Sequence, residues 1–226
     1  MAAIESALQK SEVFILDFDG TLVDSNSIKL NAFNGCFLEF LQDFPGIIDY
    51  CHSNHHTPRW IKFKHVYENI LKRPYNAAIE QSLMARYEAL TTKNIIKAPM
   101  ILSADKFLKW SKKNKRVFLV SSTPTDILIQ ILKGRNMFES FEKVQGAPVK
   151  KSEYILSLSK ELKTSVSKFL FWGDTLEDLN SAKESNCPFV GVVNEDLKNE
   201  AKWWVPDFSF ISKIPQRQIL KTGSHV

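Results

Sequence analysis

A short apolar segment that runs directly into two carboxylates constrains the fold of this chain more than any other feature. The segment reads FILDFDGTLVD over residues 14–24. Side chains alternate in direction along a strand, so Asp17 and Asp19 should project together from its carboxyl end. Ligands of open α/β sheets bind at that end of the strands. The segment therefore predicts a buried strand that carries paired acids into a functional site.

Two neighbouring carboxylates repel each other, and two arrangements relieve the repulsion: a divalent cation between them, or one carboxyl that stays protonated. Both arrangements suit phosphoryl transfer. With a hard cation such as Mg²⁺ nearby, one carboxylate can attack phosphorus while the other donates a proton to the leaving oxygen. Gly20 permits the tight turn that follows, and Thr21 offers a hydroxyl. The alternative interpretation is a pair of solvated acids in an ordinary turn.

The Asp-x-Asp-Gly-Thr-Leu run resembles the first motif of the haloacid dehalogenase superfamily of phosphohydrolases. Three further segments are similar to that family's other motifs, in the same order. The second is the apolar strand at 117–120, which stops at Ser121 and Ser122 before a helical pattern. The resemblance implies that these serines bind phosphate, in keeping with the affinity of helix N-termini for anions. By themselves, the two serines also fit a simple helix N-cap.

The third motif of the family supplies a lysine that neutralises the phosphate and the nucleophile. The corresponding segment reads GAPVKKSE over residues 146–153, and it lacks the proline that commonly follows the lysine. Two lysines compete for the role. We favour Lys151, which directly precedes the predicted helix, and keep Lys150 as the alternate.

The fourth motif resembles FLFWGDTLED over residues 169–178, an apolar strand followed by Gly-Asp-x-x-x-Asp. A spacing of four places Asp174 and Asp178 on one face of a helix. The resemblance implies that Mg²⁺ is held by Asp17, Asp174 and the backbone carbonyl of Asp19. It also implies that Asp178 contacts the ion through water or orients the lysine.

The order of predicted elements indicates an α/β fold with a Rossmann-like, doubly wound parallel sheet. Strands are expected at 12–17, 116–121, 168–172 and 188–193, and helices at 103–113, 125–134, 151–163 and 175–185. The block 26–98 shows helical periodicity instead, and its place in the chain resembles the inserted α-helical cap of the family. We expect a core of residues 1–25 plus 99–226, a cap of residues 26–98, and hinges near 23–26 and 95–101.

The cap should choose the substrate, and its most polar stretch covers residues 52–64. Within it, Arg59 and Lys62 could clamp a second anionic group of the substrate, and Trp60 could stack on a sugar or a base.

A loop is expected just before these residues, because Pro58 suits the first helical position with Thr57 as N-cap. His55 and His56 would then lie in a loop that could face the site. With His52 they could instead hold a metal, but no nearby acid pair supports that, and solvated loop histidines are the plainer interpretation.

Composition excludes several classes of protein. The net charge of +5 is spread along the chain, with its densest cluster at 112–116, which disfavours nucleic acid as a partner and suits anionic phosphates. No apolar run is long enough to span a bilayer and residues 1–10 lack a signal peptide's apolar stretch, so we expect a cytoplasmic protein without membrane contact. Its three cysteines are widely spaced, which indicates reduced packing residues rather than a disulfide or zinc site.

Within the superfamily, the chain is similar to the phosphoglycolate phosphatase branch. The resemblance implies a Mg²⁺-dependent phosphomonoester hydrolase that forms an aspartyl phosphate on Asp17. Asp19, as acid and then base, sets the chain apart from the dehalogenases and phosphonate-cleaving members, which lack that acid. The phosphomutases have a histidine at the cap hinge where this chain has Lys29. A sugar phosphomutase and a phospholigand-binding module without turnover remain the alternatives. The substrate is a small phosphorylated compound that the sequence does not specify, and the oligomeric state is open.

Overall fold

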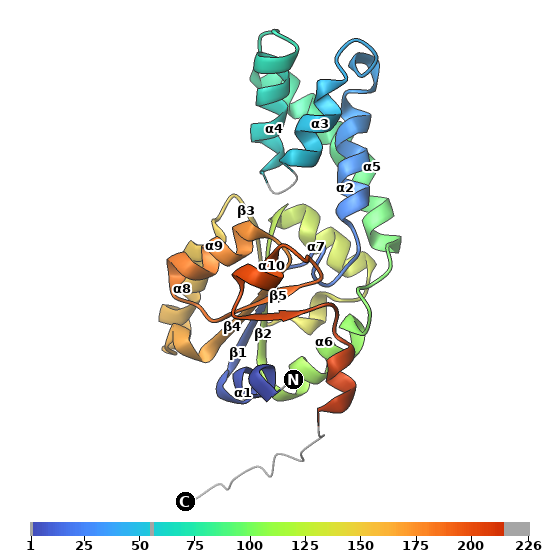
Figure 1. Ribbon diagram of the computed structural model, residues 1–226. Helices are drawn as coiled ribbons and strands as arrows, with labels where there is room; N and C mark the ends of the chain where they lie inside the picture. The colour runs from blue at the N-terminus through green and yellow to red at the C-terminus, as the bar shows by residue number, and fades with distance from the viewer. Residues whose placement is uncertain (1, 55–56, 215–226) are drawn as a thin grey trace, which may run out of the picture.

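Six parallel strands form a single sheet in the order β3-β2-β1-β4-β5-β6, which confirms the predicted fold class (Figure 1). The computed structural model describes residues 2–54 and 57–214. The strands are β1 (Val13–Leu16), β2 (Arg116–Pro124), β3 (Lys143–Ala147), β4 (Phe169–Gly173), β5 (Phe189–Val192) and β6 (Trp203–Val205).

Helices cover both faces of this sheet, which explains why β1 is buried along its whole length. Phe14 and Leu16 belong to the apolar cluster on one face, and Val13 and Ile15 to the cluster on the other. The first face is covered by α1 (Ala2–Lys10), α6 (Ala104–Asn114) and α7 (Thr125–Gly134); the second by α8 (Lys151–Leu162), α9 (Leu176–Ser185) and α10 (Leu197–Glu200). Short 3₁₀ turns complete the sheet-forming part of the chain: η3 (Phe138–Ser140), η4 (Val166–Lys168) and η5 (Ser209–Lys213).

The sheet positions the site through its strand order. β1 pairs with β2 on one side and with β4 on the other, so the direction of the order changes at β1. The carboxyl ends of these three strands therefore meet at a topological switch point, where α/β sheets bind ligands. Asp17 follows β1 directly, Ser121 lies within β2, and Asp174 follows the last residue of β4.

The segment between β1 and α6 is helical throughout its regular elements and has an apolar core of its own. We call it the helical unit; it contains α2 (Asn26–Cys36), η1 (Leu38–Phe40), α3 (Gly46–Ser53), α4 (Arg59–His65), the π-helix η2 (Val66–Ile70) and α5 (Ala77–Lys97). Phe33, Phe37 and Phe63 lie at its centre, with ring centroids 5.1–5.9 Å apart. Figure 1 shows the unit standing over one end of the sheet. Within the described residues, none of the helices combines the length and apolar character that crossing a bilayer requires.

The structure departs from the sequence prediction in several elements. β3 and β6 were not expected: β3 reads KVQGA and is mostly half-exposed, and β6 is only three residues long, so neither carries a strong strand pattern. Helix α4 begins at Arg59 with Pro58 as N-cap, one residue later than predicted. Residues 216–226, whose sequence has no core pattern, lie outside the described residues. The cysteines are free and buried, as expected of packing residues.

Candidate active site

The two acids of the first motif lie at the end of β1, with only 4% of Asp17 and 7% of Asp19 exposed. The turn after them requires glycine for two reasons. Gly20 has a φ of +77°, and a Cβ atom at this position would lie 2.0 Å from Oδ2 of Asp174. Any side chain here would strain the backbone and displace that carboxylate, so the glycine permits the first and fourth motifs to come together.

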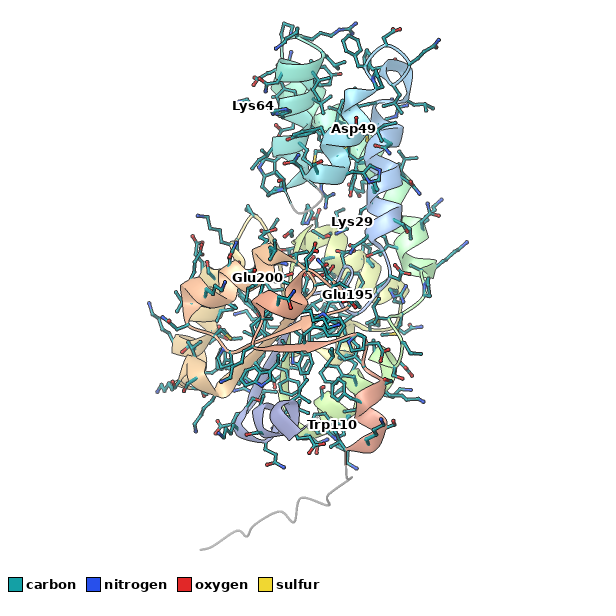
Figure 2. The ribbon with its side chains drawn as sticks, in the orientation of Figure 1. Lys29, Asp49, Lys64, Trp110, Glu195 and Glu200 are labelled. Atoms are coloured by element: carbon teal, nitrogen blue, oxygen red, sulfur yellow. The ribbon has the colours of Figure 1, made fainter. Side chains whose placement is uncertain are left out.

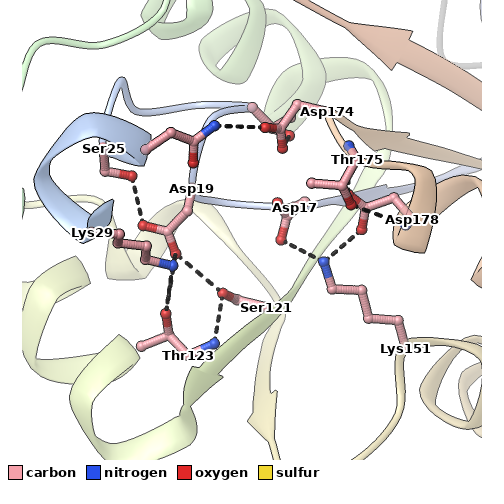
Figure 3. Close-up of polar contacts among 12 residues, drawn as sticks. Asp17, Asp19, Ser25, Lys29, Ser121, Thr123, Lys151, Asp174, Thr175 and Asp178 are labelled. Atoms are coloured by element: carbon pink, nitrogen blue, oxygen red, sulfur yellow. Dashed lines mark hydrogen bonds and ion pairs between the residues drawn. The ribbon is translucent and has the colours of Figure 1, made fainter. Parts of the chain in front are cut away.

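Lys151 bridges two of the site's acids (Figure 3). Its ammonium donates to Oδ1 of Asp17 at 3.0 Å and to Oδ1 of Asp178 at 2.5 Å. Burial alone would lower the pKa of Lys151, but the two carboxylates raise it above its usual value. Burial raises the pKa of Asp17 well above its usual value; Lys151 opposes this shift, and Asp178 adds to it. The lysine is therefore a fixed positive charge beside Asp17.

The start of α9 holds Asp178 in place. Thr175 is the N-cap, and its hydroxyl accepts from the Asp178 backbone N–H at 3.1 Å. In return, Oδ2 of Asp178 accepts from the Thr175 backbone N–H at 3.1 Å and from its hydroxyl at 2.6 Å. This reciprocal capping box leaves Oδ1 free for Lys151. Asp178 is thus in contact with Lys151, and its role toward the ion or the lysine stays a prediction.

Asp174 is held by donors from distant parts of the chain. Its Oδ1 accepts from the Thr21 hydroxyl at 3.0 Å, and its Oδ2 accepts from the Asn26 amide at 2.9 Å. The side chain of Asn194 donates to the Asp174 backbone carbonyl at 2.9 Å. Burial and the neighbouring Asp178 raise the pKa of Asp174 to about 6, against the effect of the two hydrogen bonds.

Asp19 faces a different set of partners. Its Oδ2 lies 2.5 Å from the Lys29 ammonium and accepts from the Thr123 hydroxyl at 3.1 Å, while its Oδ1 accepts from Ser25 at 2.6 Å. The hydroxyl of Ser121 is 3.4 Å from the same Oδ2. Burial would raise the pKa of Asp19, but Lys29 and these hydrogen bonds hold it below its usual value. The pKa values of the two acids are therefore shifted in opposite directions, that of Asp17 upward and that of Asp19 downward.

Three of the carboxylates fit a divalent cation. One oxygen each from Asp17, Asp174 and Asp178 lies within 4.8 Å of the others, and all three residues are buried. The site as a whole holds four buried carboxylates, including Asp19, but the described residues bring only the ammonium groups of Lys29 and Lys151 into contact with them. The remaining negative charge and the all-oxygen donor set suit Mg²⁺. The side chain of Asp19 is outside this cluster, and the resemblance implied its backbone carbonyl as the ligand.

A cavity of about 290 Å³ joins these groups to the helical unit. From the sheet side it is lined by Asp17, Asp19, Ser121, Ser122, Lys151, Thr175 and Glu177. From the other side it is lined by Asn26, Ser27, Lys29, Leu30, His52, Thr57, Pro58, Arg59, Lys62 and Tyr87. The volume lies just below the range of small-molecule sites, about 300–1,000 Å³. The arrangement can hold a small anion against a nucleophilic carboxylate.

Known proteins share the sequence pattern and the fold of this chain. Residues 14–192 match the family model described as haloacid dehalogenase-like hydrolase. The chain belongs to this family of hydrolases. No curated protein matches it in sequence.

Solved structures show the same fold in other members of the family. A hydrolase from Pseudomonas syringae has a TM-score of 0.71 at 18% identity, with 87% of this chain and 94% of that chain covered. A predicted phosphoglycolate phosphatase from Haemophilus somnus has a TM-score of 0.68 at 16% identity, with 90% and 97% covered. The HAD-hydrolase YfnB from Bacillus subtilis, whose structure is described as bound to magnesium, has a TM-score of 0.65 at 13% identity over 90% and 97%. At these low identities, the likeness shows a shared fold and nothing further.

The structure separates the predicted site residues of this hydrolase into several groups. Asp17, Asp19, Ser121, Ser122, Lys151, Asp174 and Asp178 come together at the ends of the strands. Of the two candidate lysines, Lys151 is buried beside Asp17, whereas Lys150 is an exposed N-cap residue. Arg59 and Lys62 line the cavity, but Trp60 is not among the described residues that do so. His55 and His56 lie outside the described residues.

Sequence reasoning missed several polar partners in the site. Ser25, Lys29 and Thr123 contact Asp19, and Asn26 contacts Asp174. Lys29 was noted only as a replacement for the mutase histidine. Its helical position does carry a signal, because α2 begins at Asn26 and its first turn must lie next to the motif that precedes it. The choice of Asp19 as its partner follows only from the folded arrangement.

Proposed function

We propose that this protein is a Mg²⁺-dependent phosphomonoester hydrolase that acts on a small phosphorylated metabolite through an aspartyl phosphate. The observation that carries the proposal is the position of Asp17 at the end of β1, in one cavity with Lys151 and beside an acid cluster suited to a cation. Membership of the hydrolase family supports it. The solved structure described as a predicted phosphoglycolate phosphatase supports the choice of a phosphate ester.

Asp17 is the nucleophile in the first half of the reaction. Its carboxylate attacks phosphorus, and the bond between phosphorus and the leaving oxygen breaks. Lys151, oriented by Asp178, and the hydroxyl of Ser121 stabilise the negative charge on the transferring group. When bound by Asp17, Asp174 and the backbone carbonyl of Asp19, Mg²⁺ would supply further positive charge to the phosphoryl oxygens.

Asp19 acts as the general acid and then as the general base. It donates one to the leaving oxygen, and in the second half it accepts one from the water that attacks the aspartyl phosphate. The Lys29 ion pair holds Asp19 ionised at rest, which is the state required of the base. Since the first half requires a protonated Asp19, binding of the substrate must weaken that ion pair and let Asp19 take up a proton from solvent.

The helical unit is the cap in this proposal, with the domain boundaries at residues 26 and 98. It contributes more than half of the residues that line the cavity, so its contacts would select the substrate and exclude bulk water during the transfer. The free, buried cysteines support the cytoplasm as the compartment, since thiols persist there.

Phosphate release from a panel of sugar, nucleotide and short-acid phosphates, with and without Mg²⁺, tests the proposal. We expect Mg²⁺-dependent release from at least one class, and a loss of at least about 10³-fold in kcat in Asp17→Asn. Asp24→Asn is the matched control, because Asp24 is exposed on the same loop. Hydrolysis retained in Asp17→Asn would overturn the nucleophile. Silence of the wild type across the panel, with ligand binding intact, would favour the phosphomutase or the binding module.

A further inference from the structure

The wall of the cavity formed by the helical unit carries positive charge that the protein itself does not balance. Arg59 and Lys62 are three residues apart on α4 and both line the cavity. Positions three apart lie on the same face of a helix, so the two cations share one side of the cavity. Lys64, on the same helix, is an exposed residue that lies 4.0 Å from Glu68 and does not line the cavity.

Of the two cations, Lys62 is the one whose charge is the more costly to bury, because only 9% of the residue is exposed. Its ammonium lies 4.7 Å from the centroid of the Phe33 ring, and the Arg59 guanidinium lies 4.7 Å from that of Tyr87. Within residues 2–54 and 57–214, neither cation has a carboxylate within 4.0 Å. The rest of the chain contains no Asp or Glu side chain. Aromatic faces offset only part of the cost of burying a charge.

Burial and two neighbouring cations make the charged form of Lys62 less favourable. Burial lowers its pKa to about 8, and the nearby charges of Lys29 and Arg59 act in the same direction. Lys29 has Asp19 as its partner, which leaves Arg59 and Lys62 with the uncompensated charge. An anion between them would satisfy both donors and remove their mutual repulsion.

We propose that Arg59 and Lys62 bind a second anionic group of the substrate, a carboxylate or a phosphate, opposite the phosphoryl group that Asp17 attacks. The substrate is then a small phosphomonoester with an anion at each end, and the cavity volume of about 290 Å³ suits such a compound. The assignment of the first anion rests on the proposed function. The assignment of the second rests on the cations of α4.

Calorimetric binding of phosphonates, which the enzyme cannot hydrolyse, tests this inference separately from catalysis. In the presence of Mg²⁺ we would compare 3-phosphonopropionate with 3-phosphonopropionamide, and propane-1,3-bisphosphonate with propylphosphonate. Within each pair, the compound with the second anion should bind at least about tenfold more tightly. The pair with the larger ratio identifies the second group as a carboxylate or a phosphate.

Two variants and a control locate the effect. Lys62→Met keeps the apolar stem of the buried side chain, and it should bring the members of each pair within about threefold of each other while leaving the affinity for the amide or monophosphonate unchanged. Arg59→Gln should do the same, and Lys64→Met should retain the wild-type ratio.

Equal affinity of the wild type within both pairs, or no binding of either compound with two anions, overturns the inference. So does a Lys62→Met variant that loses affinity equally for all four compounds. Failure of the proposed hydrolase would look different: the binding preference would be present, and no phosphate ester would be cleaved.

Discussion

The two walls of the cavity differ in how their positive charges are paired. At the ends of the strands, Lys151 contacts Asp17 and Asp178, so the ammonium is balanced before any ligand arrives. On α4, Arg59 and Lys62 lie over aromatic rings without a carboxylate partner in the described residues. A group that is paired within the protein is held in a fixed geometry, which suits a reaction common to many substrates. A group that lacks a partner gains most from a ligand that supplies one, which suits selection between substrates.

The largest difference between the walls should appear when Lys151 is replaced. Lys151→Met removes the charge beside Asp17 and leaves Asp178 unpaired, so kcat should fall by about 10²–10³-fold. The unfolding free energy should fall by about 3–5 kcal/mol, the usual cost of breaking a buried ion pair from one side. Steady-state kinetics and denaturant unfolding measure the two effects. Lys150→Met should change neither; a comparable loss in that exposed variant would contradict the assignment of the lysine.

Addition of Mg²⁺ should stabilise the protein through the carboxylates at the strand ends and not through Arg59 and Lys62. Because an ion held by Asp17 and Asp174 would relieve the repulsion among Asp17, Asp174 and Asp178, saturating Mg²⁺ should stabilise the protein by about 2–3 kcal/mol at roughly one hundred times its dissociation constant. Thermal unfolding with and without the ion measures this without reference to activity. Asp174→Asn should lose most of the shift, whereas Lys62→Met should retain it. A shift of the same size in Asp174→Asn would place the ion elsewhere.

The smallest effect expected is a dependence of substrate preference on pH, caused by Lys62 in the helical unit. The pKa of Lys62 is about 8 in the free protein, so its charge is present below that pH and is lost above it. Arg59 and Lys29 are the charged groups that face it; the nearby thiol of Cys51, whose pKa burial raises to about 12, stays neutral.

The quantity to measure is kcat/KM for a phosphate ester with a second anion, divided by that for its neutral counterpart. This ratio should fall between about pH 8 and pH 9.5, by up to about tenfold per pH unit, because kcat/KM reports ionisation of the free enzyme. In Lys62→Met the ratio should be flat. A fall of the same size in that variant would assign the titration to another group.

Local sequence predicted which residues gather at the strand ends better than it predicted the wall of the helical unit. Asp17, Asp19 and Asp174 each follow or adjoin a strand end, and the parallel sheet brings strand ends together by its own geometry. Figure 2 shows Lys29 at the base of the helical unit, facing the sheet, a placement that its sequence neighbours do not specify. The same is true of Tyr87, which reaches the cavity from α5, far along the chain from Arg59. Edge strands β3 and β6 escaped prediction because short or half-exposed strands carry little apolar pattern.

The sequence by itself determined the class of fold, the order of the four motifs and the acids of the site, because strand alternation and motif spacing act over a few residues. Only the tertiary structure decided which lysine contacts Asp17 and that Lys29 pairs with Asp19. It also decided that Arg59 and Lys62 face the cavity with no carboxylate partner among the described residues. These are contacts between residues distant in the chain. Their geometry depends on how the helical unit packs over the sheet, which no local pattern encodes.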